Sequence, residues 1–202
     1  MNDQPIRFRF NAKKAAQAAS KLLRLSGGQR NYMELVKLLY LADREALVRL
    51  HCQVTGNPLA ALPLGLVLSH ILDLIRWGPI NEEDAPWFEA VSPPFGYDVK
   101  SIADAGDDEL SGAECQILEE VFAKYGSKNW KELSRLTHAL PEWVDPNGGR
   151  IPISAEQILK LEGKSPEEIE RIRGELAAFE QLDRELSVYR GQEFEVPEQV
   201  LA

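Results

Sequence analysis

Residues 32–50 read YMELVKLLYLADREALVRL, and this stretch decides most of what the sequence predicts about the fold. Apolar side chains recur in it every three or four residues, which is the period of a helix with one apolar face. They are Leu35, Leu38, Leu39, Ala42, Ala46 and Leu50. The pattern predicts a helix from about Asn31 to His51. A similar stripe predicts a preceding helix over 12–25, with Asn11 as its N-cap and Gly27-Gly28 as its end. Two helices joined by so short a turn should pack as a hairpin.

The middle of the chain is less regular. Residues 53–66 are rich in Gly and Pro and predict an irregular connection, with a short strand over 59–62. Residues 67–77 predict a helix that ends at Gly78-Pro79. Residues 97–102 alternate between polar and apolar side chains and predict a second strand. The two strands together could form a small ribbon on the helical body.

Serine capping signals predict helices in the second half of the chain. These helices should begin at Ser111, Ser154 and Ser165, and the last should run to about Arg190. A short helix is also expected over 129–140. The fold class predicted is therefore mainly α: a compact helical domain with a small β ribbon and a long C-terminal amphipathic helix.

The C-terminal helix suggests a division into a helical domain, 1–163, and a helical extension, 164–202. One face of this helix carries the candidate partner-binding residues Ile169, Ile172, Leu176 and Phe179. Such a face can lie in a hydrophobic groove of a partner protein. It can equally dock on its own domain, or pair two copies of the chain as a homodimer. The sequence leaves these three possibilities open.

The net charge of −9 is unevenly distributed. Residues 1–50 hold ten Lys and Arg against four Asp and Glu, residues 51–153 hold seven against sixteen, and residues 154–202 hold six against twelve. Because phosphate neutralisation supplies most non-specific affinity for nucleic acids, so acidic a chain argues against direct nucleic-acid binding. The acidic C-terminal part instead fits a basic protein partner.

Composition also suggests a location. The sequence shows no apolar run long enough to span a membrane and no apolar core of a signal peptide near its start. Its two cysteines, Cys52 and Cys115, have no motif spacing and suit a reducing compartment. We therefore expect a cytoplasmic protein that does not associate with membranes.

A search for reactive groups gives little support for catalysis. The sequence lacks the common phosphate-loop, dinucleotide, nucleophile-elbow and metalloprotease motifs. Its three histidines are not spaced as metal ligands, so we expect neither a metal nor a cofactor. The strongest enzymatic hypothesis uses His138 as a general base oriented by Asp145 or Asp43. No nucleophile accompanies it, and His138 would more simply bond to backbone at a helix end. We therefore expect no enzymatic activity.

Several short motifs resemble one family. The string KLLYLADR, residues 37–44, resembles the opening motif of the Panacea domain, also called SocA-like. The Thr55-Gly56 turn, the element LGLVLS at 64–69, and LSRLTH at 133–138 followed by Trp143 resemble the motifs that come later in that domain. The resemblance spans roughly residues 12–160. One departure is Leu66, which stands where the family has proline after the glycine and could alter a surface that the family uses.

The resemblance implies a mainly α fold and a role as an antitoxin, which binds and neutralises a protein toxin encoded nearby. It implies, as an alternative, a proteolytic adaptor that delivers the toxin to a protease, and it suggests a phage-associated, GepA-like member of a toxin–antitoxin system. The motif residues themselves are expected to be structural. They are Lys37, Leu38, Tyr40, Asp43, Arg44, Gly65, Ser69, His138 and Trp143.

Overall fold

The structure is a computed structural model that describes residues 5–190. The chain divides into two compact units between Gly163 and Lys164. The helices of the first unit are α1 (Ala12–Leu25), α2 (Tyr32–Leu50), α3 (Ser69–Trp77), the 3-10 turn η1 (Glu82–Asp84), α4 (Ala85–Ala90), α5 (Gly112–Tyr125), α6 (Trp130–His138) and α7 (Ala155–Leu161). Its strands are β1 (Gln29–Asn31), β2 (Leu59–Leu62), β3 (Gly65–Leu68), β4 (Asp98–Lys100) and β5 (Ile151–Ile153). The prediction of a mainly helical fold is confirmed.

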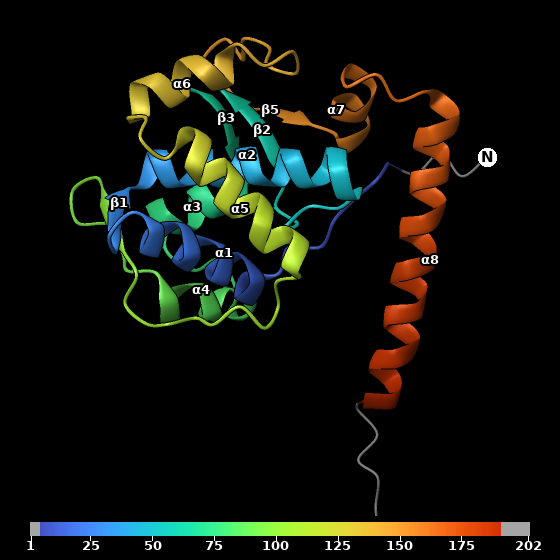
Figure 1. The fold of residues 1–202 in the computed structure, drawn as a ribbon, viewed down its shortest axis with the longest axis horizontal. Coiled ribbons are helices and arrows are strands. Elements are labelled where there is room, and N and C mark those ends of the chain that lie inside the picture. The colour runs from blue at the N-terminus through green and yellow to red at the C-terminus, as the bar shows by residue number, and fades with distance from the viewer. Residues whose placement is uncertain (1–4, 191–202) are drawn as a thin grey trace, which may run out of the picture. The chain divides into compact units, whose positions relative to one another are not determined.

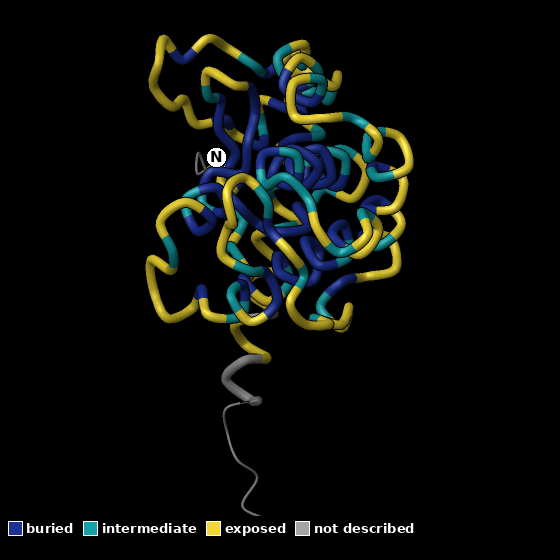
Figure 2. Tube along the Cα trace, turned by 90° about the vertical axis from the view of Figure 1, so that its left-hand side faces the viewer, coloured by how far each residue is buried: buried dark blue, intermediate teal, exposed yellow. Residues whose placement is uncertain are grey.

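Helix α2 is the centre of the first unit (Figure 1). It contacts α1, α5, α6, α7 and β3, so that few of its side chains from Met33 to Leu47 reach solvent. Figure 2 shows the same arrangement as a buried interior surrounded by exposed loops. The predicted bounds of α1 and α2 are close to those observed, and the Asn11 side chain accepts a hydrogen bond from the backbone N–H of Lys14, as an N-cap should.

The predicted ribbon is wrong in its pairing. Strand β2 pairs antiparallel with β3 on one side and with β5 on the other. Strand β4 instead pairs with β1, the three residues between the glycine turn and α2. The pairing of β2 with β3 is a local hairpin, and closing so short a loop costs little conformational entropy. The two predicted strands therefore exist, but they belong to different sheets.

The helix predicted over 67–77 begins later than expected. Residues Gly65–Leu68 are strand β3, and α3 starts at Ser69. The apolar run Leu66–Leu68 is completely buried in the strand, and a short buried run cannot be assigned to helix or strand from periodicity alone. Helix α4 was not predicted at all. It is only six residues long, and Pro86 occupies its first turn, where proline is tolerated.

The second unit contains α8 (Pro166–Arg190). It begins with reciprocal hydrogen bonds between Ser165 and Glu168, which cap its first turn. No helix in the described part of the chain is long and apolar enough to cross a membrane.

Candidate functional site

The motif residues of α2 point in two directions. Lys37, Tyr40 and Arg44 are spaced by three and four residues, so they share one face of the helix. This face meets the β2–β3 hairpin and the segment that includes α6 and Glu142. Asp43 lies on another face and meets the turn at Thr55. The motif therefore ties several segments to one central helix.

Lys37 is a fully buried lysine. Its Nζ donates to the carbonyl oxygen of Leu64 at 2.6 Å and to Oγ1 of Thr137 at 3.2 Å. The structure shows no ion pair to Lys37 among the described residues. Burial lowers the pKa of its ammonium group to about 8, because the charged form loses its hydration. Lys37 thereby fixes the hairpin turn against α6.

Gly65 allows this close approach. Its φ of +100° lies in the region that side chains rarely adopt. A Cβ atom there would lie 2.3 Å from Oγ1 of Thr137 and 2.9 Å from Nζ of Lys37. The neighbouring Leu66, which replaces the family's proline, is fully buried. The side chain of this departure lies in the interior, and its effect on a surface that the family uses stays a prediction.

A second buried group joins α2 to the segment after α6. Glu142 is fully buried, and its Oε1 accepts hydrogen bonds from Tyr40 Oη at 2.8 Å and Arg44 Nε at 2.7 Å. Burial and the adjacent carboxylate raise the pKa of Tyr40. Burial disfavours the charged Arg44, yet its bonds to Glu142 and Glu162 raise its pKa overall. A buried carboxylate with two donors is a structural tie, and its loss would leave Tyr40 without an acceptor and Arg44 with Glu162 alone.

Asp43 holds the Thr55-Gly56 turn. Its carboxylate accepts from the backbone N–H of Thr55 at 3.0 Å and from the Thr55 hydroxyl at 2.6 Å. Burial raises the pKa of Asp43 to about 7, although the bonds from Thr55 act in the opposite direction. Gly56 has a φ of +67°, and a Cβ atom there would lie 2.1 Å from the carbonyl oxygen of Arg9. The turn therefore needs both the aspartate and the glycine.

His138 ends α6 and packs on Trp143, with ring centroids 4.4 Å apart. Its Nε2 is buried and makes no hydrogen bond within the part of the chain that the structure describes. Asp43 is engaged by Thr55, and Asp145 accepts from the backbone N–H of Asn147. The structure therefore does not show the carboxylate contact that would orient His138 as a general base. Trp143 in turn donates from Nε1 to the carbonyl oxygen of Leu62.

The remaining motif residues are also interior. Leu38 is fully buried, and the hydroxyl of Ser69 donates to the carbonyl oxygen of Pro58 at 3.0 Å. The nine predicted motif residues thus lie around α2, the hairpin and α6. Sequence reasoning missed Glu142 and Thr137. The pair Tyr40 and Arg44, one helical turn apart in the predicted core, was the available signal that an acidic acceptor must lie opposite.

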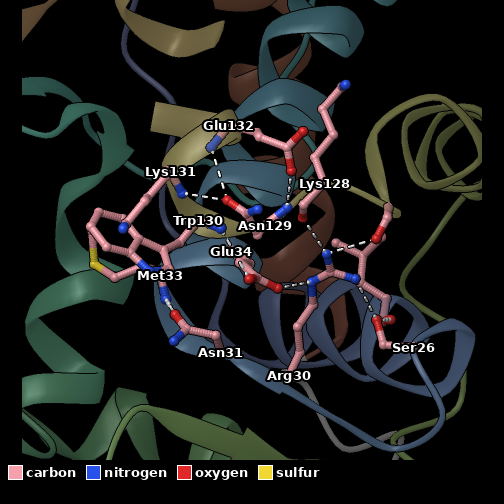
Figure 3. Close-up of polar contacts among 12 residues, drawn as sticks. Ser26, Arg30, Asn31, Met33, Glu34, Lys128, Asn129, Trp130, Lys131 and Glu132 are labelled. Carbon is pink, nitrogen blue, oxygen red and sulfur yellow. Dashed lines mark hydrogen bonds and ion pairs between the residues drawn. The ribbon is translucent and has the colours of Figure 1, made fainter. Parts of the chain in front are cut away.

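A polar hollow of about 420 Å³ lies beside the first turn of α2. Arg30 lines it, donating to the carbonyl oxygens of Gly126 and Lys128 and pairing with Glu34 at 3.0 Å (Figure 3). Glu34 also accepts from the backbone N–H of Trp130. Because these charged groups engage one another, the cluster fixes the α5–α6 connection rather than presenting free groups to a ligand. No group of three His, Cys, Asp or Glu residues in the described chain could hold a metal ion.

A known protein family matches the central part of the chain. A family model described as "Antitoxin SocA-like, Panacea domain" matches residues 35–144, which is more than half of the 202 residues. The chain belongs to the SocA-like Panacea antitoxin family. No curated protein and no solved structure matches it. The resemblance to the Panacea domain is confirmed over a shorter range than predicted, and the phage-associated, GepA-like character stays a prediction.

The Panacea match ends before α8. The candidate partner-binding residues Ile169, Ile172, Leu176 and Phe179 are spaced by three, four and three residues and so share one face of that helix. Ile169 and Ile172 are buried, at 9% and 0% exposed, whereas Phe179 is 69% exposed. The role of this face in binding a partner stays a prediction.

Proposed function

We propose that this protein is an antitoxin that neutralises its toxin by direct protein–protein contact in the cytoplasm. Membership of the Panacea antitoxin family carries the proposal. Two features of the first unit agree with it. The motif residues are engaged in buried hydrogen bonds that hold the fold, and several large apolar side chains are exposed, including Trp77 at 80% and Phe95 at 90%. Aromatic side chains are frequent anchors of protein interfaces.

The net charge of −9 supports a protein partner over nucleic acid, because an acidic surface repels phosphates. The surroundings of His138 favour a binding protein over an enzyme that uses this residue as a general base. The imidazole ring packs on Trp143, and the two carboxylates that could orient it form hydrogen bonds elsewhere. We therefore propose that the protein acts without an enzymatic step.

Co-expression with the product of the adjacent reading frame tests the proposal. We expect the protein to restore growth of cells that express this product, and the two purified proteins to form a complex of defined stoichiometry. Failure of both would contradict the proposal. The same assay in a strain that lacks individual cellular proteases separates sequestration from delivery to a protease. Protection by sequestration persists in that strain, whereas protection by an adaptor is lost.

A further inference from the structure

The connection between α3 and α4 exposes apolar side chains. Ile80 is 59% exposed, and Trp77, two residues before Pro79, is 80% exposed. An open hollow of about 570 Å³ lies over this connection. Its apolar lining consists of Pro79, Ile80, Ala85 and Phe88, and its acidic lining consists of Glu82 and Glu89. We call this feature, lined by residues 79–82, 85, 88 and 89, the α3–α4 groove.

Buried hydrogen bonds fix the loop that forms one wall of the groove. Asp84 is 1% exposed, and its Oδ2 accepts from the backbone N–H groups of Ile80 at 2.9 Å and Asn81 at 3.1 Å. Its Oδ1 lies 2.9 Å from Nε2 of His70, which packs edge-on against Phe10. Burial disfavours the ionised carboxyl, yet these bonds keep the pKa of Asp84 below its usual value. The loop is therefore fixed from within while it points apolar side chains outward.

The α4 side of the groove is fixed as well. Trp87 is 1% exposed and lies on α4, which packs against α1. Phe88, the next residue, is only partly buried and lines the groove. A surface that keeps its shape before binding loses less conformational freedom when a partner docks. The groove has this property at both of its walls.

The charge of the groove is one-sided. Glu82 and Glu89 line it, and no Lys or Arg does so. Neither glutamate has an ion-pair partner among the residues that the structure describes, whereas the adjacent Glu83 lies 3.6 Å from Arg9. An apolar floor with acidic walls is complementary to a segment that carries apolar and basic side chains.

We infer that the α3–α4 groove binds a short basic, amphipathic segment of the partner protein. An apolar side chain of that segment lies on Ile80 and Phe88, and its Lys or Arg residues approach Glu82 and Glu89. The inference rests on the proposed function, because it names the surface through which an antitoxin of this kind would hold its toxin. It assigns recognition of the partner to the first unit and does not involve the candidate face of α8.

The direct test uses a synthetic probe and the full chain. The probe is a peptide of about 16 residues, roughly four helical turns, built from Leu and Lys with one apolar face. A control peptide has Glu at every Lys position. We expect the Lys peptide to shift the amide resonances of residues 79–89 in the ¹⁵N-labelled protein and to change the fluorescence of Trp77. The fluorescence change should be lost in a Trp77→Phe variant, and the Glu peptide should bind at least about tenfold more weakly.

Matched variants separate the groove from the general acidity of the chain. A Glu82→Lys/Glu89→Lys double variant and an Ile80→Ser variant should each weaken binding of the Lys peptide by about tenfold or more. Glu119→Lys is the charge control, because Glu119 is 58% exposed and pairs with Lys21 on another face. Phe95→Ser is the apolar control, since Phe95 is 90% exposed and does not line the groove. Both controls should bind within about twofold of the wild type. Circular dichroism confirms that each variant is folded.

Any of three results with the peptides would overturn the inference: shifts that map outside 77–89, equal binding of the Glu peptide, or equal loss in the control variants. Concentration-dependent shifts of 79–89 without peptide would also overturn it, because a second copy would then occupy the groove. The outcome is separate from that of the proposed function. If the peptide maps to the groove but the adjacent gene product does not bind, the proposed function fails and the groove stands. If that product binds and the Ile80→Ser variant still holds it, the groove fails and the proposed function stands.

Discussion

The surroundings of α2 and the α3–α4 groove differ in which side chains they bury and which they expose. Around α2, polar and charged side chains such as Lys37, Asp43 and Glu142 are fully buried and bonded. In the groove, apolar side chains such as Ile80 are exposed and supported from beneath by a buried carboxylate. Burying polar groups and exposing apolar ones both cost free energy, so neither arrangement is neutral. The first gives the domain a defined interior, and the second suits binding.

If the groove binds the partner as inferred, the motif residues that carry the family resemblance are not the residues that touch the partner. Lys37, Gly65 and Thr137 form contacts that tolerate little change in size or charge. A sequence motif built on such contacts reports the fold. In the proposed function the partner surface consists of exposed positions, which can vary with little loss of stability. Substitutions at the two places should therefore have different consequences.

The largest effect on stability is expected for Glu142→Ala. This change leaves Tyr40 without its buried acceptor and leaves Arg44 with Glu162 as its remaining carboxylate, so the cost is at most that of a broken buried pair, about 3–5 kcal/mol. Urea unfolding measures the loss. Glu142→Gln, which keeps an acceptor oxygen, should lose less. An equal loss for both variants would contradict the assigned role of the acceptor oxygen, and Lys13→Ala, which breaks a surface pair, should change little.

Asp43→Asn tests the buried turn through pH. Because burial raises the pKa of Asp43 to about 7, the folded state holds a proton that the unfolded state has lost between about pH 4 and 7. This group therefore makes the free energy of unfolding fall as pH rises through that window. Asparagine keeps an acceptor for the Thr55 N–H but does not titrate. We expect the variant to gain stability relative to the wild type across the window, by at most about 4 kcal/mol. A difference that stays constant with pH would contradict the account.

Gly65→Ala should cost about 2–3 kcal/mol, because it combines an unfavourable φ with a close contact to Thr137. Gly148→Ala is the matched control. Gly148 has a φ of +84° but nothing within 4 Å of its Cβ position, so only the backbone term of about 1 kcal/mol remains. Thermal unfolding of the two variants compares them. Equal losses would show that the packing around Lys37 does not need the glycine.

The smallest effect on stability is expected for Trp77→Ser. Trp77 is 80% exposed, and exposed substitutions usually stay within about 0.5 kcal/mol of the wild type. Trp87, ten residues later and 1% exposed, provides the contrast, since Trp87→Ala should cost about 3–5 kcal/mol. Differential scanning calorimetry distinguishes the two. A large loss at Trp77 would mean that this side chain holds the fold rather than serving a surface role.

Local patterns predicted the helices well but not the pairing of the strands. The 3.6-residue period over 32–50 and the cap at Asn11 depend on neighbours in sequence, so they could be read directly. The pairing of β1 with β4 joins residues 29–31 to 98–100, and the alternating pattern does not specify a partner so distant. The buried run at 66–68 fits either element, and for this reason the pattern predicts helix for residues 67 and 68, which belong to β3.

The candidate site was predictable only in part, for the same reason. The motif residues on α2 could be named from the resemblance, but their acceptors, Glu142 and Thr137, lie about one hundred residues away in the sequence. The groove could not be found from sequence, because Ile80 and Phe88 resemble ordinary core residues. The loop at Ile80 is held by Asp84, whose bonds to Ile80 and Asn81 appear only in three dimensions.

The most direct test of direct-contact neutralisation is the affinity of the purified protein for the product of the adjacent reading frame, measured by isothermal titration calorimetry. We predict a saturable complex for the wild type and for Glu142→Gln at a temperature where that variant is folded. Restored growth in cells without measurable binding between the purified proteins would contradict the account.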